Sequence, residues 1–168
     1  MKTGPRYHVQ PRRHRQRKTD YRARLKLLRG KKPRIVVRKS LKAIRVQFVE
    51  YSPQGDKILV SAISSELVKE FGWKYSVSTT PAAYLTGLLA GKRAVEKGIE
   101  EGILDIGLYH PTVGSTLFAT LKGVLDAGVA CPHDKEMLPK EERIHGAHLN
   151  KDIKPILGEI KTKIIGGK

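Results

Sequence analysis

The 168-residue sequence has a single cysteine, few aromatic side chains and no long apolar run. One cysteine, Cys131, excludes an internal disulfide and suits a reducing compartment. An aromatic content of 6% argues against a single-strand binder that stacks bases on an aromatic sheet. The longest apolar run, residues 82–90, is too short to span a membrane, and no apolar stretch follows the charged N-terminus as it would in a signal peptide. These absences predict a soluble cytoplasmic protein with no membrane partner.

Acidic residues are almost absent from the first 45 positions. This stretch holds eighteen Lys or Arg and one acid, Asp20, and therefore carries a net charge of +17. Residues 46–168 hold fifteen bases and fifteen acids, so the rest of the chain is neutral. Unpaired charge of this kind costs several kcal/mol per ion to bury, so it must face solvent or a polyanion. A block of Arg and Lys beside a neutral domain is typical of nucleic-acid binding.

The length suits one compact domain with tails, and composition divides the chain into three parts. Residues 1–18 hold two prolines and almost no aliphatic side chains, so this basic N-terminal arm cannot fold alone. Its bases are mostly Arg, which suits phosphate, and we expect the arm to order on an RNA backbone; a solvated tail is the alternative. Residues 19–130 should form an α/β RNA-binding domain. Residues 131–168 should form an extended C-terminal tail, where Pro155 and Gly158 limit any helix to a turn or two.

A basic helix is expected between an N-cap at Thr19 and a terminating Gly30. Tyr21, Leu25 and Leu28 recur at i, i+4 and i+7 and form a narrow apolar seam by which the helix would dock on the domain. The rest of the helix surface is basic. Because basic runs flank the helix on both sides, RNA contact by this surface is favoured over a plain solvated helix.

The periodicity then changes to two. Residues 34–40, 43–51 and 57–64 alternate apolar and polar side chains or are rich in β-branched residues, which is typical of strands. Short links, including a turn with Pro and Gly at residues 52–56, predict an antiparallel three-strand meander. The bases of the first two strands would continue the RNA surface onto a rigid sheet, where charge can position a partner.

Helices and one more strand are expected after the meander. A short helix over residues 65–71 follows a serine cap and ends at Gly72, and a longer helix begins at a Thr80 cap. A strand at residues 106–109 precedes a helix over 116–127, which Ser115 or Thr116 caps. This order predicts an α/β fold with a mixed sheet, in which helices pack on the sheet and the last strand joins it by a crossover.

The end of the longer helix is basic. Lys92, Arg93 and Lys97 suit the helix dipole there, and RNA contact is an equally good interpretation of Lys92 and Arg93. Residues 87–93, GLLAGKR, resemble a phosphate-binding loop. Their glycine spacing is wrong, and they lie within a helix rather than after a strand, so we reject that interpretation.

Two other constellations could carry chemistry. Cys131, His133, His145 and His148 could supply zinc ligands, but the charged, Pro-broken loop between them matches no usual zinc motif. Ser115 follows a glycine but has no nucleophile-elbow sequence and no acid placed to orient a histidine. We therefore predict no catalytic residue, no metal ligand and no cofactor.

Four motifs then resemble one ribosomal family in their order along the chain: HRQRKTDYRARLKLL, KPRIVVRKS, AAYLTGLLAGKRA and PHDKEMLPKEERIHG. The chain resembles the 5S-rRNA-binding proteins of the large ribosomal subunit, universal family eighteen, over almost its whole length. The tail from Pro132 onward resembles the archaeal and eukaryotic forms, and the chain is closest to the archaeal type. The resemblance implies a mixed α/β domain with a ribonuclease-H-like topology but no nuclease activity. It also implies binding to 5S rRNA, attachment of that RNA to the large-subunit rRNA, and a place beside neighbouring ribosomal proteins in the central protuberance.

Charge and resemblance together predict which residues contact RNA. They are Arg6, Arg12, Arg13, Arg15, Arg17, Lys18, Tyr21, Arg22, Arg24, Arg29, Lys31, Lys32, Arg34, Arg38, Lys39, Lys42 and Arg45. The main alternative is a nucleic-acid-processing enzyme with a basic docking arm, and a more distant one is a DNA-compacting protein.

Overall fold

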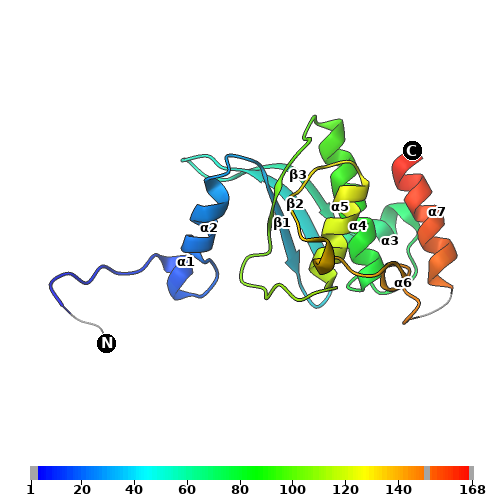
Figure 1. Cartoon of the computed structure of the whole chain (residues 1–168), viewed down its shortest axis with the longest axis horizontal. Helices are drawn as coiled ribbons and strands as arrows, with labels where there is room; N and C mark the ends of the chain where they lie inside the picture. The colour runs from blue at the N-terminus through cyan, green and yellow to red at the C-terminus, as the bar shows by residue number, and fades with distance from the viewer. Residues whose placement is uncertain (1–3, 150–151, 167–168) are drawn as a thin grey trace.

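Three strands form the antiparallel meander that the sequence predicts (Figure 1). The computed structural model describes residues 4–149 and 152–166. The strands are β1 (Arg34–Lys39), β2 (Ile44–Glu50) and β3 (Lys57–Ile63). Val37 lies opposite Val46 in the register of β1 and β2, and Val46 lies opposite Ala62 in that of β2 and β3. Because side chains alternate along a strand, this register gathers the apolar residues on one face of the sheet.

A fourth strand, β4 (Ile103–Asp105), pairs in parallel with β1 and completes a mixed sheet in the order β3-β2-β1-β4. The predicted crossover is confirmed, but the predicted strand at residues 106–109 is wrong. The chain leaves the sheet after Asp105, whose Oδ1 accepts a hydrogen bond from the Gly107 amide at 2.9 Å. Gly107 has a φ of 67°, which favours glycine and turns the chain away.

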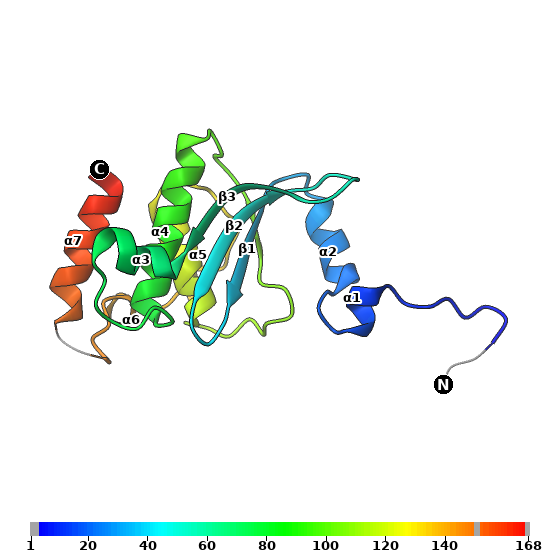
Figure 2. The ribbon, with the colours of Figure 1, turned by 180° about the vertical axis from the view of Figure 1, so that it is seen from behind.

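Helices cover one face of this sheet (Figures 1 and 2). They are α3 (Ser64–Phe71), α4 (Thr80–Glu96) and α5 (Thr116–Asp126). The α/β class and the packing of helices on a mixed sheet are therefore confirmed. Gly72, in the left-handed region at a φ of 70°, ends α3.

The helix starts differ slightly from the prediction. Thr79 is the N-cap residue of α4, and Thr80 is already helical and buried. No serine caps α3, because Ser64 is its first residue and its Oγ accepts a hydrogen bond from the Ile44 amide at 2.9 Å. Ser115 occupies the N-cap position of α5 as predicted, but its Oγ is buried and has no hydrogen-bond partner in the described part of the chain.

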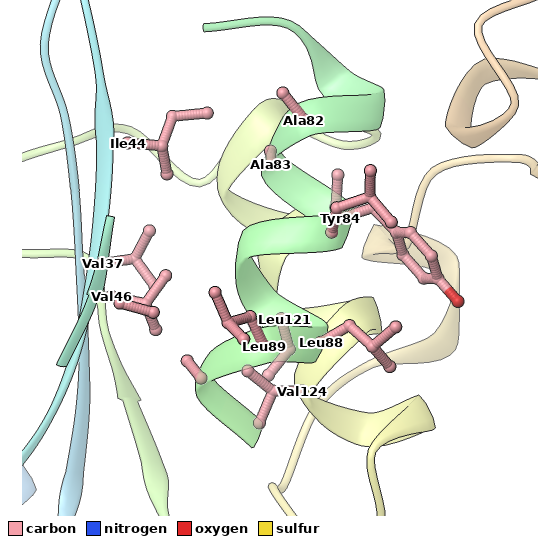
Figure 3. Packing of buried hydrophobic residues seen from close by; sticks show 14 of the residues in the cluster. Val37, Ile44, Val46, Ala82, Ala83, Tyr84, Leu88, Leu89, Leu121 and Val124 are labelled. Atoms are coloured by element: carbon pink, nitrogen blue, oxygen red, sulfur yellow. The ribbon is translucent and has the colours of Figure 1, made fainter. Parts of the chain in front are cut away.

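Helix α4 is the centre of the core. One apolar face was predicted for it, but thirteen of its seventeen residues are buried. Figure 3 shows the reason, because Leu89 faces the sheet residues Val37 and Val46 while Leu121 and Val124 of α5 lie beside it. The helix is enclosed between the sheet and a second helical layer, so its burial extends around most of its circumference.

The C-terminal region is not an extended tail. It contains η1 (Lys135–Met137), α6 (Glu141–Ile144) and the fourteen-residue α7 (Ile153–Gly166). Pro155 does not limit α7, because it lies in the first turn, where its missing N–H is not needed. Gly158 is exposed, and this single glycine lowers the intrinsic helix propensity of α7 without preventing the helix. Four isoleucine or leucine residues of α7 are buried in the same core as α4.

Truncation of a buried α7 side chain should destabilise the whole domain. Leu157 and Ile160 are 2% and 1% exposed, so Leu157→Ala or Ile160→Ala should lower the free energy of unfolding by about 2–5 kcal/mol. Urea denaturation measures this change. Ile165→Ala, at an exposed position of the same helix, is the control and should have little effect. Equal stability of all three variants would contradict the docking of α7.

Candidate nucleic-acid interface

The face of the sheet that points away from α4 and α5 carries polar and basic side chains. In β1 the side chains of Ile35 and Val37 are buried in the core. Because side chains alternate along a strand, Arg34, Val36 and Arg38 lie on the opposite face. Arg45 and Gln47 of β2 follow the same alternation. The period-two pattern that builds the core therefore also presents a row of arginines on the other side.

The N-terminal helices lie on this second side (Figures 1 and 2). They are α1 (Arg12–Arg15) and α2 (Tyr21–Leu28). The N-cap of α2 is Asp20, not Thr19 as predicted. Its Oδ1 accepts hydrogen bonds from the amides of Arg22 and Ala23 at 2.8 and 3.1 Å. The amides of Ala23 and Arg22 hold the pKa of Asp20 below its ordinary value, as expected for a carboxylate at a helix N-terminus.

The predicted docking seam of α2 is also wrong. Tyr21 and Leu25 are 38% and 56% exposed, and no residue of α2 is buried. The helix turns Ala23, Arg24 and Leu27 toward the sheet instead. Apolar spacing located a helix but not the face it presents, because Arg24 and Leu27, rather than Tyr21 and Leu25, line the cleft.

A cleft of about 830 Å³ separates α2 and the segment before it from the open sheet face. Six bases line it, from three different parts of the chain: Arg13, Lys18, Arg24, Lys26, Arg34 and Arg38. Three acids also line it, Asp20, Asp56 and Asp105. Apolar side chains such as Val36, Leu27 and Leu104 form part of its wall. The cleft is therefore basic, with a partly apolar lining.

Five of these charged side chains form one continuous row, which we call the ion-pair chain: Arg24, Asp56, Arg34, Asp105 and Arg38. The successive N–O distances are 2.8, 2.6, 2.7 and 3.1 Å. Arg34 and Asp105 are only 5% and 6% exposed, so the middle of the chain is buried. Buried charges of this kind are tolerated when each has a partner and further hydrogen bonds.

Two opposing effects act on the pKa of Asp105. Burial raises it, but the nearby Arg38 and Arg34 outweigh burial and hold the pKa below its ordinary value. The carboxylate is therefore charged in the folded protein at neutral pH. Its negative charge is neutralised by two guanidinium groups, so it does not repel a polyanion in the cleft as a free acid would.

Asp105→Asn should destabilise the protein in a pH-dependent way. At pH 7 it removes one partner of a buried ion pair, which costs about 3–5 kcal/mol of the free energy of unfolding. Because the folded pKa lies below the ordinary value of 3.8, the wild-type stabilisation is complete above that pH and is lost as the pH falls through the folded pKa. Denaturation between pH 7 and pH 2 should show the two proteins converging in acid. A gap that stays constant with pH would contradict this role of the carboxylate.

The structure separates the sixteen basic residues among the predicted RNA contacts into two groups. Four have carboxylate partners: Arg24, Arg34, Arg38, and Lys32, which pairs with Glu101 at 2.5 Å. Within the described ranges the following have no ion-pair partner: Arg6, Arg12, Arg13, Arg15, Arg17, Lys18, Arg22, Arg29, Lys31, Lys39, Lys42 and Arg45. The predicted set omitted Lys26, which lines the cleft. Its place among the bases of the same helix was the signal that could have included it.

The basic end of α4 has a role that the sequence did not reveal. Arg93 pairs with Glu66 at 2.6 Å and donates to the carbonyl of Ser61 at 2.9 Å, and Lys97 donates to the carbonyl of Leu59 at 2.6 Å. These carbonyls belong to β3, an edge strand of the sheet. The two cations therefore satisfy backbone groups that an exposed edge would otherwise leave open.

Cys131 and the histidines considered as zinc ligands lie in the described part of the chain. Among the described residues, no group of three or more His, Cys, Asp or Glu is arranged to hold a metal ion. Cys131 is buried, and burial raises the pKa of its thiol. In the part of the chain that the structure describes, no helix is both long and apolar enough to cross a membrane.

Comparisons with known proteins identify the family. A family model described as ribosomal large subunit proteins 60S L5 and 50S L18 matches residues 5–102, more than half of the chain. The chain belongs to this family. Two relatives, each named large ribosomal subunit protein uL18, come from the archaea Aeropyrum pernix and Haloarcula marismortui. They are 51% and 52% identical to the chain over 149 residues, which are 89% of this chain and 70% and 79% of the respective relatives.

Membership confirms three of the predictions. The family is that of large-subunit ribosomal proteins, and the similarity to the two uL18 proteins confirms the archaeal type. A structural ribosomal protein, not an enzyme, is therefore the class of this chain, and the processing-enzyme alternative is rejected. Ribosomal proteins of this kind work in the cytoplasm, as predicted.

Proposed function

We propose that the chain binds 5S rRNA through the cleft and the basic surfaces around it, and helps attach this RNA to the large-subunit rRNA in the central protuberance. The carrying observation is that the N-terminal helices and the arginine-bearing sheet face enclose one basic cleft. Residues of α2 and of the sheet line this cleft, and α2 lies on the far side of the sheet from α4 and α5 (Figures 1 and 2), so RNA in the cleft would not disturb the core. The proposed neighbours are the large-subunit rRNA and other ribosomal proteins of the central protuberance.

Each of the three parts of the chain would have its own role in binding. The arm, residues 1–18, supplies affinity through bases that have no acidic partner in its described portion. The domain, residues 19–130, supplies a fixed register through α2 and the sheet. In the C-terminal part, residues 131–168, helices α6 and α7 contact α4, and we propose that this part meets neighbouring proteins. The strand order β3-β2-β1-β4, with β4 parallel to β1, supports the further proposal of a ribonuclease-H-like topology.

Recognition should depend on RNA shape. The major groove of A-form RNA is too narrow for side chains to read, whereas loops, bulges and the phosphate backbone are accessible. Arg suits such contacts because its planar fork binds phosphate with two hydrogen bonds and stacks on bases. The partly apolar lining of the cleft could accept the face of an unstacked base beside these contacts.

Binding to 5S rRNA should weaken steeply with salt. If the protein neutralises about 6–10 phosphates, its affinity should fall by about 10³–10⁵ between 50 and 200 mM monovalent salt. A filter-binding or fluorescence titration with an archaeal 5S rRNA transcript measures this slope. A tRNA competitor tests selectivity, because recognition of shape predicts that it competes much less well than unlabelled 5S rRNA. Equal competition by the two RNAs would contradict the proposed function.

A further inference from the structure

Helix α2 has few attachments to the rest of the domain. None of its residues is buried: Tyr21 and Leu25 are exposed, and Leu27 and Leu28 are only half-buried. Within the described residues, the ion pair between Arg24 and Asp56 is the one that joins α2 to the turn between β2 and β3. The position of α2 over the cleft therefore depends strongly on this contact.

Asp56 is well placed to hold the helix. It lies just before β3, in the turn that follows β2, and both of its carboxylate oxygens accept hydrogen bonds. Nη2 of Arg24 lies 2.8 and 3.0 Å from these two oxygens, and Nη2 of Arg34 lies 2.6 Å from Oδ2. Isolated surface ion pairs contribute little, but a carboxylate shared by two guanidinium groups in a network holds a defined geometry.

The other end of the ion-pair chain orders the opposite wall of the cleft. Arg38 donates to the Asp105 carbonyl at 2.7 Å and pairs with its carboxylate, which also accepts from the Gly107 amide. This arrangement orients the loop after β4, and the hydroxyl of Tyr109 in that loop donates to the Lys39 carbonyl. The ion-pair chain thus runs from α2 at one side of the cleft to this loop at the other.

We propose that Asp56 is a positioning residue for RNA binding: it holds Arg24, and with it α2, so that the bases of this helix face the cleft. The inference rests on the proposed binding of 5S rRNA. It gives an acidic residue a favourable role in binding a polyanion. Asp56 would act through Arg24 and would not itself contact RNA.

This role and simple electrostatics predict opposite changes in the affinity for 5S rRNA when Asp56 is substituted. Asp56→Asn removes a negative charge beside the cleft, so electrostatics alone predicts unchanged or tighter binding of any RNA. Loss of positioning predicts weaker binding of 5S rRNA, by about tenfold, the equivalent of about one misplaced charge-assisted hydrogen bond. Binding of tRNA, which needs no fixed register, should stay equal or become slightly tighter.

Glu50→Gln is the matched control. Glu50 is exposed, ends β2 opposite Lys57 in the register, and has no ion pair in the described part of the chain. Glu50→Gln makes the same change of charge within the same hairpin, but Glu50 has no ion pair with α2. Its substitution should therefore leave the affinity for 5S rRNA equal or slightly tighter.

The test is a double-mutant cycle in the full chain, with affinities for 5S rRNA and tRNA measured at one salt concentration. Arg24→Gln should weaken 5S binding, and Asp56→Asn should weaken it no further in the Arg24→Gln background, because Asp56 acts through Arg24. Thermal unfolding verifies that the variants are folded. If Asp56→Asn unfolds the protein, Asp56→Glu takes its place in the cycle with Arg24→Gln. The same non-additivity is then expected.

Three results would overturn the inference. Asp56→Asn could behave like Glu50→Gln, it could weaken tRNA as much as 5S rRNA, or it could add its full effect to that of Arg24→Gln. Failure of the proposed function is a different result, because the wild-type chain would then not prefer 5S rRNA over tRNA. If the wild type shows that preference and Asp56→Asn does not reduce it, only the positioning role fails.

Discussion

Removal of residues 1–32 is expected to lower the affinity for 5S rRNA by about 10³-fold or more near physiological salt. The deleted segment holds thirteen of the thirty-three Lys and Arg residues, and it includes α1 and α2. Because log affinity falls with log salt by roughly one unit per phosphate contact, the salt dependence should become shallower as well. Titrations of the full and truncated chains at several salt concentrations measure both changes.

A shorter deletion separates the arm from the helix. Removing residues 1–18 leaves α2 and the ion pair of Arg24 with Asp56 in place, so it should give an intermediate affinity and slope. Neither α1 nor α2 contains a buried residue, so both truncated chains should unfold at nearly the wild-type denaturant concentration. Equal affinity of the full chain and the chain lacking residues 1–32 would show that the basic N-terminal segment does not bind.

The second large effect is expected at the crossing of α4 and α5. A Cβ atom at Gly87 would lie 2.0 Å from the Thr120 carbonyl oxygen, and one at Gly123 would lie 2.1 Å from the Tyr84 carbonyl oxygen. Both neighbours are helical backbone, which cannot turn aside as a flexible side chain can. Gly87→Ala or Gly123→Ala should therefore force the helices apart and lower the free energy of unfolding by about 3 kcal/mol or more, above the usual cost of overpacking.

Gly158→Ala is the matched control for this prediction. Gly158 lies within α7, and a Cβ atom there meets nothing within 4 Å. The same substitution should stabilise the protein by about 0.5–1 kcal/mol, because alanine favours the helix more than glycine does. Urea denaturation of the three variants compares one chemical change in two environments. If all three had the same effect, the close approach of α4 and α5 would be contradicted.

The local pattern of the sequence was sufficient to predict the three-strand meander. The β-branched residues of 34–40 and the alternation at Ile44, Val46 and Phe48 predict strands, and the structure confirms this meander. Gly72 ended its helix as predicted, because a left-handed residue at that position suits glycine. These features depend on residues close to one another in the chain.

The features that the sequence did not reveal involve contacts between distant residues. The contact of Arg34 with RNA stays a prediction, but its buried ion pair with Asp105, which lies 71 positions away, follows from no local pattern. The orientation of α2 was wrong for the same reason, because Arg24 and Asp56 are 32 positions apart. In α7, the presence of Pro155 obscured a helix whose stability comes from packing on α4 rather than from local propensity.

We propose that RNA binds the face of the sheet opposite the core helices. Ultraviolet cross-linking of the full chain to 5S rRNA, followed by mass spectrometry of the attached peptides, tests it most directly. Cross-links are expected in residues 12–31 and along β1 and β2, and they should disappear when unlabelled 5S rRNA is added in excess. Cross-links concentrated on α3, α4 or α7, with the cleft residues unmodified, would show that RNA binds another surface.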